Sequence, residues 1–250
     1  MQLKRGGYIT HSRVFTESLY TERGINWIIG SHTNEVEKNT IHYETLNGEQ
    51  KEHKFDFSML IPPFSGVGMK AYNRIGADIT SELFAPSGFM LVDADYSKKS
   101  YDQWSPEDWP KTYQAPKYNN IFAVGIAFAP PHPVSKPMFS TNGTPIFPTP
   151  PRTGMPSGVM AREVAFSVVD MIKGKSDKPT RTASMAKMGA ACIASAGAGF
   201  LNGTAASMTM YPIIPDFKTY PDTGRSLAYT SGEIGLAGHW IKHFLHFAFI

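Results

Sequence analysis

The chain has 250 residues, of which 42% are hydrophobic and 18% are charged, enough for one large or two modest folded domains and too apolar for a disordered chain. The 24 lysines and arginines exceed the 21 acidic residues by 3, too small an excess to indicate a nucleic-acid-binding protein. The single cysteine excludes an internal disulfide framework and a zinc site built from several cysteines, and no run of 18 apolar residues predicts a membrane-spanning helix.

The first quarter of the chain predicts a helix followed by strands. Residues 11–23 carry spaced apolar positions and predict a helix that ends near Gly24. Asn47-Gly48 lies between two runs that alternate apolar and polar residues, which is the strongest hairpin signal in the sequence. The apolar run 57–61, closed by Pro62-Pro63, predicts a buried strand.

The middle of the chain alternates short apolar runs with irregular segments. Residues 88–93 predict a short strand, and the polar residues 97–118 predict an inserted loop. Residues 119–129 predict a buried strand that reaches Gly125. The proline-rich segment 130–156 is long for a plain connection, so we expect it to take part in function.

The clearest helical pattern spans residues 156–174. Pro156 suits its first turn, and Lys173-Gly174 suits its end. The face that we expect to be buried repeats every three or four residues and consists of Met160, Val164, Val168 and Ile172.

The C-terminal stretch from residue 239 predicts an amphipathic helix. Its polar stripe spans about 100° of the helix and consists of His239, Lys242, His243 and His246. The rest of its surface is apolar: Trp240, Ile241, Phe244, Leu245 and Phe249. This pattern is typical of a helix that lies flat in a membrane interface, and it equally suits a core-packed helix with a solvated face. The three histidines have metal-ligand spacing without a nearby acidic partner, so we expect no metal site.

Most motifs of known catalytic sites are missing from the sequence. No complete G-x-G-x-x-G follows a predicted strand, and there is no P-loop, no G-x-S-x-G and no credible pair of carboxylates. What remains is a strand that reaches Gly125 and a helix that opens near Thr153-Gly154. A glycine lets the backbone approach a ligand, and a helix N-terminus offers free N–H groups. Together they suit an anionic or electron-accepting group, such as the pyrimidine edge of a flavin.

Several stretches of the chain resemble the C-terminal half of the sulfide:quinone oxidoreductases, which are two-dinucleotide-binding-domain flavoproteins related to the flavin subunits of flavocytochrome c sulfide dehydrogenase. The resemblance covers residues 10–250, and its most specific feature is the Gly125 strand, the Thr153-Gly154 helix and Cys192 in this order. The stretches are "FDFSMLIPPFSGV", "GFMLVDADYS", "YNNIFAVGIAFAPP", "TPPRTGMPSGVMAREVAFSVVDMIKG" and "MGAACIASAGAG".

The resemblance implies an α/β fold, α+β in its C-terminal part, that forms a portion of such a flavoprotein with a membrane-facing helical region at the C-terminal end. Residues 1–60 correspond to the end of the second dinucleotide-binding-like domain. Residues 61–175 correspond to the return segment of the FAD-binding domain, and residues 176–250 to the redox-cysteine and membrane-associating region. The FAD-binding glycine motif and the partner cysteine would precede this chain.

The resemblance also implies which residues contact FAD. Val124, Gly125 and Ile126 would lie against its pyrophosphate and ribityl chain. Ile126 stands where many members of the wider superfamily have an aspartate. Thr153 and Gly154 would meet the pyrimidine edge of the flavin.

Cys192 resembles the C-terminal member of the redox cysteine pair, which carries persulfide or polysulfide beside the flavin. Its neighbours are mostly alanine and glycine, which would leave room for a sulfur chain. A quinone pocket would include Ile193 and Pro62. Ile193 stands where many family members have an aromatic residue.

The function implied by the resemblance is oxidation of sulfide to polysulfide or sulfur, with electrons passing through FAD to quinone. The protein would be a peripheral membrane protein, and this chain alone would be inactive. The acceptor, the side of the membrane and a homo-oligomeric state stay open. The alternatives are a type II NADH:quinone oxidoreductase, a flavocytochrome c-type flavin subunit, or a non-catalytic binding or assembly domain that lacks the flavin half.

Overall fold

The structure is a computed structural model that describes residues 10–61, 63–146, 153–196 and 200–249. The helices of these ranges are α1 (Thr10–Glu22), α2 (Thr80–Leu83), α3 (Gly154–Ile172) and α4 (Leu236–Phe249), with the short 3-10 helices η1 (Tyr101–Gln103), η2 (Pro106–Asp108) and η3 (Gly125–Ala127). The strands are β1 (Ser31–Glu37), β2 (Thr40–Thr45), β3 (Gln50–Lys54), β4 (Gln114–Ala115), β5 (Tyr118–Phe122), β6 (Met138–Phe139), β7 (Pro145–Ile146), β8 (Ala190–Ala196), β9 (Thr204–Met210) and β10 (Gly232–Gly235).

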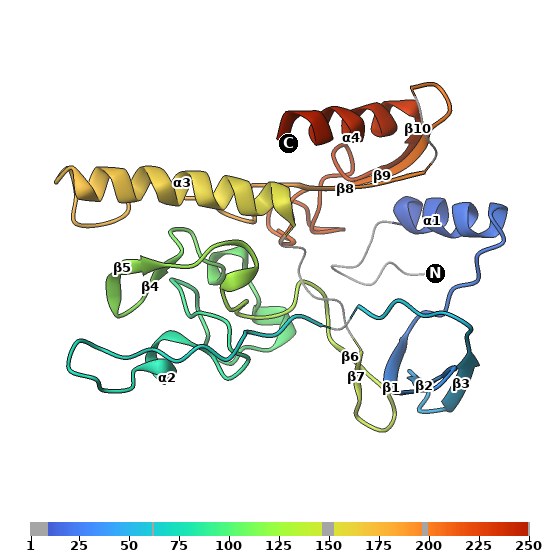
Figure 1. The fold of residues 1–250 in the computed structure, drawn as a ribbon, viewed down its shortest axis with the longest axis horizontal. Coiled ribbons are helices and arrows are strands. Elements are labelled where there is room, and N and C mark those ends of the chain that lie inside the picture. The colour runs from blue at the N-terminus through green and yellow to red at the C-terminus, as the bar shows by residue number, and fades with distance from the viewer. Residues whose placement is uncertain (1–9, 62, 147–152, 197–199, 250) are drawn as a thin grey trace.

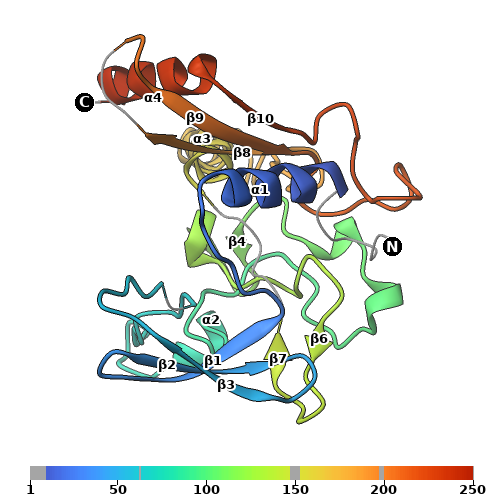
Figure 2. The ribbon, with the colours of Figure 1, turned by 90° about the vertical axis from the view of Figure 1, so that its right-hand side faces the viewer.

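The described strands pair in small antiparallel sheets, in the orders β1-β2-β3, β10-β9-β8, β4-β5 and β6-β7. Helix α3 runs along the segment that carries α2, β4 and β5 (Figure 1). The β10-β9-β8 sheet lies between α4 on one face and α1 on the other (Figure 2). The expected mixture of helices and strands is confirmed, but within the described ranges the strands form no extended parallel sheet.

The expected N-terminal helix and the expected hairpin are confirmed. Helix α1 ends at Glu22, two residues before Gly24, whose φ of +64° is a left-handed conformation that favours glycine. Strands β2 and β3 form the expected hairpin around Asn47-Gly48, with Gly48 at φ +80°. Thr141 fastens this turn to the β6-β7 hairpin, because its hydroxyl donates a hydrogen bond to the carbonyl of Asn47 (2.9 Å).

The main core gathers side chains from segments far apart in the sequence. Trp109, Tyr113 and Phe128 are fully buried there, and they pack with Met160 of α3 and with Ala190 of β8. Burial of one such large side chain stabilises the fold by about 1.5–3 kcal/mol. This core therefore joins α3 and the start of β8 to the irregular segment between β5 and β6.

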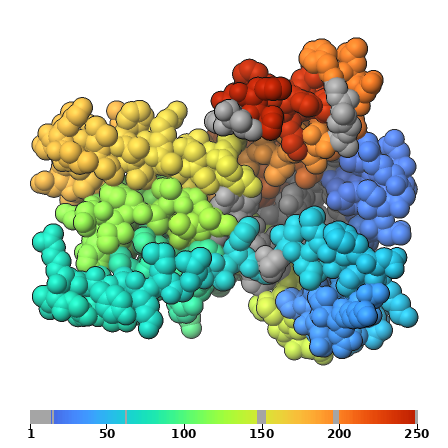
Figure 3. Space-filling model, in the orientation of Figure 1, coloured from blue at the N-terminus to red at the C-terminus, as the bar shows by residue number. Residues whose placement is uncertain are grey.

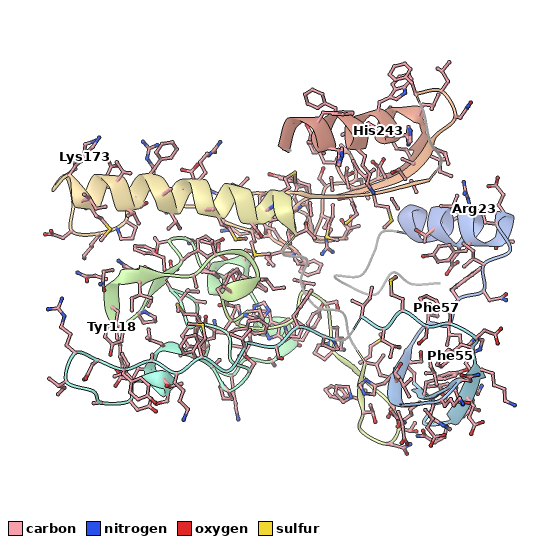
Figure 4. The ribbon with its side chains drawn as sticks, viewed as in Figure 1. Arg23, Phe55, Phe57, Tyr118, Lys173 and His243 are labelled. Carbon is pink, nitrogen blue, oxygen red and sulfur yellow. The ribbon has the colours of Figure 1, made fainter. Side chains whose placement is uncertain are left out.

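The strand predicted over residues 57–61 is wrong. These residues form no strand, and Phe57, which Figure 4 labels on the segment after β3, is 87% exposed. An apolar run becomes a buried strand only where a partner strand supplies hydrogen bonds and another layer covers its face. The described part of the chain supplies neither here.

The two other predicted strands are shorter than expected. Residues 88–93 make only isolated bridges, in which Met90 pairs with Phe84 and with Phe128. The strand expected over residues 119–129 ends at Phe122, because the left-handed backbone of Gly125 (φ +62°) turns the chain into η3. The predicted loop 97–118 contains η1, η2 and β4.

Both predicted helices of the second half are present. Helix α3 ends at Lys173-Gly174 as expected and buries Met160 fully, whereas Ile172 at the other end of the expected buried face is 80% exposed. In α4 the expectation that His239 belongs to a solvent-exposed polar stripe is wrong, because its side chain is 1% exposed and packs against the sheet. No helix in the described ranges is both long enough and apolar enough to cross a membrane.

Tyr113 provides a test of the core. Its hydroxyl donates a buried hydrogen bond to the carbonyl of Ala183 (2.8 Å), and burial raises its pKa above the ordinary value of 10.0. Tyr113→Phe leaves that carbonyl without its partner, so we expect the free energy of unfolding to fall by about 1–2 kcal/mol in urea denaturation. Tyr229→Phe, at an exposed ring, should leave the stability unchanged. An equal loss in both variants would contradict this role of Tyr113.

Candidate functional site

Gly125 lies against the first turns of α3, as the order of motifs in the sequence predicts. Its backbone N–H donates to the sulfur of Met160 (3.4 Å). A Cβ atom at Gly125 would lie 2.6 Å from the hydroxyl oxygen of Ser157, closer than real Cβ contacts allow. The neighbour Val124 packs half-buried on the core, while Ile126 is 40% exposed. The turn thus brings its backbone close to α3 and leaves Ile126 open to solvent.

The first turn of α3 carries backbone N–H groups of the kind that bind ligands at helix N-termini. Thr153 is the N-cap residue, but its side chain accepts no hydrogen bond from the helix. Gly154 and Met155 occupy the first turn, where backbone N–H groups have no partner inside a helix, and both are exposed. No acidic residue lies in this turn, so the positive end of the helix dipole is not neutralised by a side chain of its own helix.

Cys192 lies on β8, two residues beyond the buried Ala190 and on the same face of the strand. Ala190 belongs to the same core as Met160, which contacts Gly125, so the fold brings β8 to the region of the Gly125 turn. The Cys192 side chain is exposed. The structure therefore connects the three sequence-predicted parts of the site, the Gly125 turn, the α3 N-terminus and the Cys192 strand, through one core.

The closest neighbour of Cys192 across the sheet is Met208 of β9, its directly opposite partner in the β8–β9 pairing. The hydroxyl of Thr16 in α1 donates to the sulfur of Met208 (3.5 Å), which places α1 on the Cys192 face of the sheet. Sequence reasoning missed Met208 as well as Ser157. That Met208 lies beside Cys192 can be predicted only once the β8–β9 register is known. Nothing in the sequence indicates that Ser157 contacts Gly125.

Ile193 lies on the opposite face of β8, toward α4. Its methyl carbon Cγ2 is 3.8 Å from the Cβ position of Gly238, the residue through which α4 approaches the sheet. Cys192 and Ile193 therefore face the two different sides of one sheet. Pro62, the other residue expected at a quinone pocket, lies outside the described residues.

The histidines of α4 are spaced along the helix as metal ligands can be. The rings of His239 and His243 lie 4.4 Å apart between centroids. Within the described ranges, no three histidine, cysteine, aspartate or glutamate side chains are grouped so that they could hold a metal ion.

Comparison with known proteins identifies a relative. No family model matches the chain. The sulfide-quinone reductase of Aquifex aeolicus (strain VF5) is 31% identical over 196 residues, which are 78% of this chain and 37% of that protein. The chain is a homologue of sulfide-quinone reductase. The resemblance described from the sequence is thereby confirmed, and the coverage is consistent with a C-terminal portion.

A solved structure shows the same fold. The X-ray structure of the sulfide:quinone oxidoreductase from the hyperthermophilic bacterium A. aeolicus matches with a TM-score of 0.58 at 24% identity. The match covers 93% of this chain and 42% of that one. The arrangement of small sheets and helices is therefore similar in fold to part of that structure. The chain spans well under half of the length of either match.

The contact of Gly125 with Ser157 gives a testable prediction. Gly125→Ala places a methyl group against Ser157 at a φ of +62°, whereas Gly143→Ala, also at a positive φ (+87°), has nothing within 4 Å. We expect Gly125→Ala to lower the free energy of unfolding by about 1–3 kcal/mol more than Gly143→Ala, because only the former adds a clash. Urea denaturation of both variants measures the difference.

A second substitution checks the cause. Ser157→Ala in the Gly125→Ala background removes the oxygen at 2.6 Å and should recover part of the lost stability. If the double variant is no more stable than Gly125→Ala alone, the close approach to Ser157 is not what requires a glycine here.

Proposed function

We propose that this chain is the C-terminal portion of an FAD-dependent sulfide:quinone oxidoreductase, which oxidises sulfide to polysulfide or sulfur and passes the electrons to a quinone. The observation that carries the proposal is the 31% identity to a sulfide-quinone reductase. In addition, the single cysteine is exposed on a strand that shares a buried core with the Gly125 turn. A type II NADH:quinone oxidoreductase would not need this thiol.

The residues around α3 fit one part of an FAD site. The left-handed turn at Gly125 allows a close approach of the backbone, and the first turn of α3 presents N–H donors and contains no acidic residue of its own. Val124, Gly125 and Ile126 would hold the pyrophosphate and ribityl region, and Thr153 and Gly154 would donate to the pyrimidine edge. When bound, FAD supplies the two-electron redox chemistry that no side chain of this chain provides.

Cys192 would bind the sulfur atoms covalently during sulfide oxidation. A disulfide between Cys192 and a cysteine outside this chain would be attacked by sulfide, so that the disulfide bond breaks, a new sulfur–sulfur bond forms and one thiolate leaves. Ala190 and Ala194 share the Cys192 face of β8, and their small side chains leave space for a growing sulfur chain. The exposure of Cys192 lets sulfide reach it from water.

The quinone would be reached from the other face of the sheet. Ile193 points toward α4, whose outward side chains Trp240, Phe244 and Phe247 are exposed. In the space-filling view α4 forms the surface of the molecule above the sheet (red, Figure 3). An apolar surface of this kind would lie in a membrane interface and give a lipid-soluble quinone a short route to Ile193. In this proposal, residues 1–60 end the second dinucleotide-binding-like domain and residues 61–175 return to the FAD-binding domain. Residues 176–250 form the redox-cysteine and membrane-associating region.

Substitution of Cys192 tests the proposed chemistry. In the complete flavin-containing protein, Cys192→Ser should lower sulfide-dependent quinone reduction by about two orders of magnitude or more, because serine cannot form the disulfide that sulfide attacks. The flavin absorbance should be retained, since the exposed Cys192 side chain is not part of the core. Decyl-ubiquinone reduction with sulfide as donor measures the rate.

Moving the thiol along β8 provides the matched control. Ser195→Cys in the Cys192→Ser background places a thiol on the α4 face, whereas Ala194→Cys places it one step along on the original face. We expect no recovery from the first variant and measurable recovery from the second. Full activity of Cys192→Ser would remove Cys192 from the sulfur relay and favour the NADH-linked or cytochrome-linked alternative.

The proposed membrane contact has its own test. Phe244→Glu/Phe247→Glu should weaken binding to lipid vesicles by about tenfold or more, because two exposed rings of α4 can no longer enter the apolar layer. Phe57→Glu/Phe64→Glu changes two equally exposed rings outside α4 and should have little effect. Co-sedimentation with vesicles compares the pairs, and an equal loss in both would show that α4 is not the membrane contact.

A further inference from the structure

A small cavity is lined by residues other than those of the site described above. Its volume is about 130 Å³, and it is formed between η1, the segment around His132 and the segment 214–217. Three aromatic side chains contribute to its wall, Tyr101, Trp104 and Phe217, together with the aliphatic Val134 and Ile214. No residue of the proposed sulfide oxidation lines it.

The aromatic wall is held rigidly. Trp104 stacks on His132 with ring centroids 4.4 Å apart and planes inclined by 11°, and the edge of Trp109 meets the same imidazole at 5.4 Å. The indole N–H of Trp104 donates to the carbonyl of Lys99 (3.2 Å). Because the polar edge of Trp104 is bound to the backbone and one face of its ring stacks on His132, Trp104 offers the cavity only the apolar remainder of its ring.

The polar atoms of His132 are also turned toward the protein. Nδ1 donates to the carbonyl of Pro133 (2.8 Å), since a carbonyl oxygen can only accept, and Nε2 lies 3.4 Å from Oδ2 of Asp108. The side chain of His132 is only 10% exposed. The cavity therefore has a preorganised aromatic wall in which the indole N–H of Trp104 and Nδ1 of His132 are bound to the backbone, while Nε2 of His132 has no hydrogen-bond partner among the described residues.

The charges around this wall favour a positive ligand. Asp102 is the one lining residue with a permanent charge. Behind the wall, Asp95 and Asp108 share a single ammonium, that of Lys99, whose hydrogen bond lowers the pKa of Asp95 and keeps it ionised. The ammonium of Lys136 lies 5.9 Å from the centroid of the Tyr101 ring. Three carboxylates thus lie beside two lysines, and the ring of His132 adds a positive charge only when it is protonated.

The remaining charges beside the cavity are balanced. Glu107 accepts a hydrogen bond from Ser105 of the wall, and Asp216 follows the lining residue Pro215. The hydrogen bond from Ser105 is the main cause that lowers the pKa of Glu107, and Lys111 lowers it further; burial opposes ionisation of Asp216, but hydrogen bonds from Thr219, together with Lys218, lower its pKa. These two pairs do not reverse the excess of negative charge.

We infer that this cavity binds an organic cation, an ammonium group that carries apolar substituents. Aromatic faces combined with a carboxylate are the chemistry that recognises such ions, because the π-electrons and the carboxylate attract the charge while the apolar surface contacts the substituents. The ammonium of Lys136 already lies over the Tyr101 ring, which shows that an aromatic face here can contact a cation. An anion would meet no lysine or arginine in the lining.

The volume sets the size of the ligand. A cavity of about 150 Å³ holds one benzene molecule, so 130 Å³ suits a single small group such as a trimethylammonium head. Choline is therefore a suitable probe, and 3,3-dimethylbutan-1-ol is its uncharged isostere. This inference goes beyond sulfide oxidation, and its test requires no turnover.

The experiment is ¹⁹F NMR of the protein labelled with 5-fluorotryptophan, with the Trp104 signal assigned by Trp104→Phe. We expect choline to shift the Trp104 signal saturably, and the isostere to bind at least about tenfold more weakly, because it lacks the charge. Equal binding of the two compounds, or no shift with choline, overturns the inference.

Two single-charge variants are compared with the unmodified protein. Asp102→Asn should weaken choline binding by about tenfold, because it removes the lining carboxylate. Lys136→Ala should strengthen it by about threefold, because it removes the competing ammonium from Tyr101. Unchanged signals of the other tryptophans show that each variant is folded. Undiminished binding in Asp102→Asn also overturns the inference.

A free cation and a lipid headgroup share this chemistry, and vesicles distinguish them. A preference for phosphatidylcholine over phosphatidylglycerol vesicles that disappears in Asp102→Asn assigns the cavity to a choline headgroup. Binding of choline without such a preference assigns it to a free organic cation.

Discussion

The packing of Gly125 against α3 is the constraint on which the arrangement of the candidate site depends. The left-handed glycine ends the β5 segment and leaves no room for a Cβ beside Ser157, while its N–H meets the sulfur of Met160. Met160 is fully buried in the core that also contains Ala190. One close backbone contact thus fixes α3, and through the core it also fixes the strand that carries Cys192.

The sequence predicted the local features of this arrangement well. The hairpin at Asn47-Gly48 and the end of α3 at Lys173-Gly174 follow from residues whose backbone preferences are strong. The association of Gly125 with the α3 N-terminus followed from the order of the motifs and the family resemblance. These features depend on near neighbours or on a single glycine, so they can be read without the tertiary structure.

The errors concern features that depend on distant partners. The apolar run 57–61 carries a strand pattern, but a strand needs a pairing edge that composition does not reveal. The helical wheel of α4 placed His239 on a solvated stripe, although Gly203 leaves space for that ring: a Cβ at Gly203 would lie 2.1 Å from it. The Met208 neighbour of Cys192 depends on the β8–β9 register, which is likewise a tertiary property.

Helix α4 is attached to the sheet mainly by its first turns. Gly238 brings it within 3.1 Å of Ala205 at the Cβ position, and the indole N–H of Trp240 donates to the carbonyl of Phe200 (2.6 Å), with the two rings stacked at 5.0 Å. His239 fills the space beside Gly203. From His243, labelled in Figure 4, onward, the described side chains are exposed. The small residues therefore set the position of the helix, while its later turns are free to contact another surface.

The alternation along β8 has a consequence for changes in chain length. Cys192 and Ile193 differ by one position and face opposite sides of the sheet, and the strand pairs with β9 along its whole length from Ala190 to Ala196. A slip of one residue turns every side chain of a strand to the other face. In a related chain, a one-residue insertion or deletion inside β8 would exchange the surroundings of the thiol and its neighbour, whereas a two-residue change would preserve them.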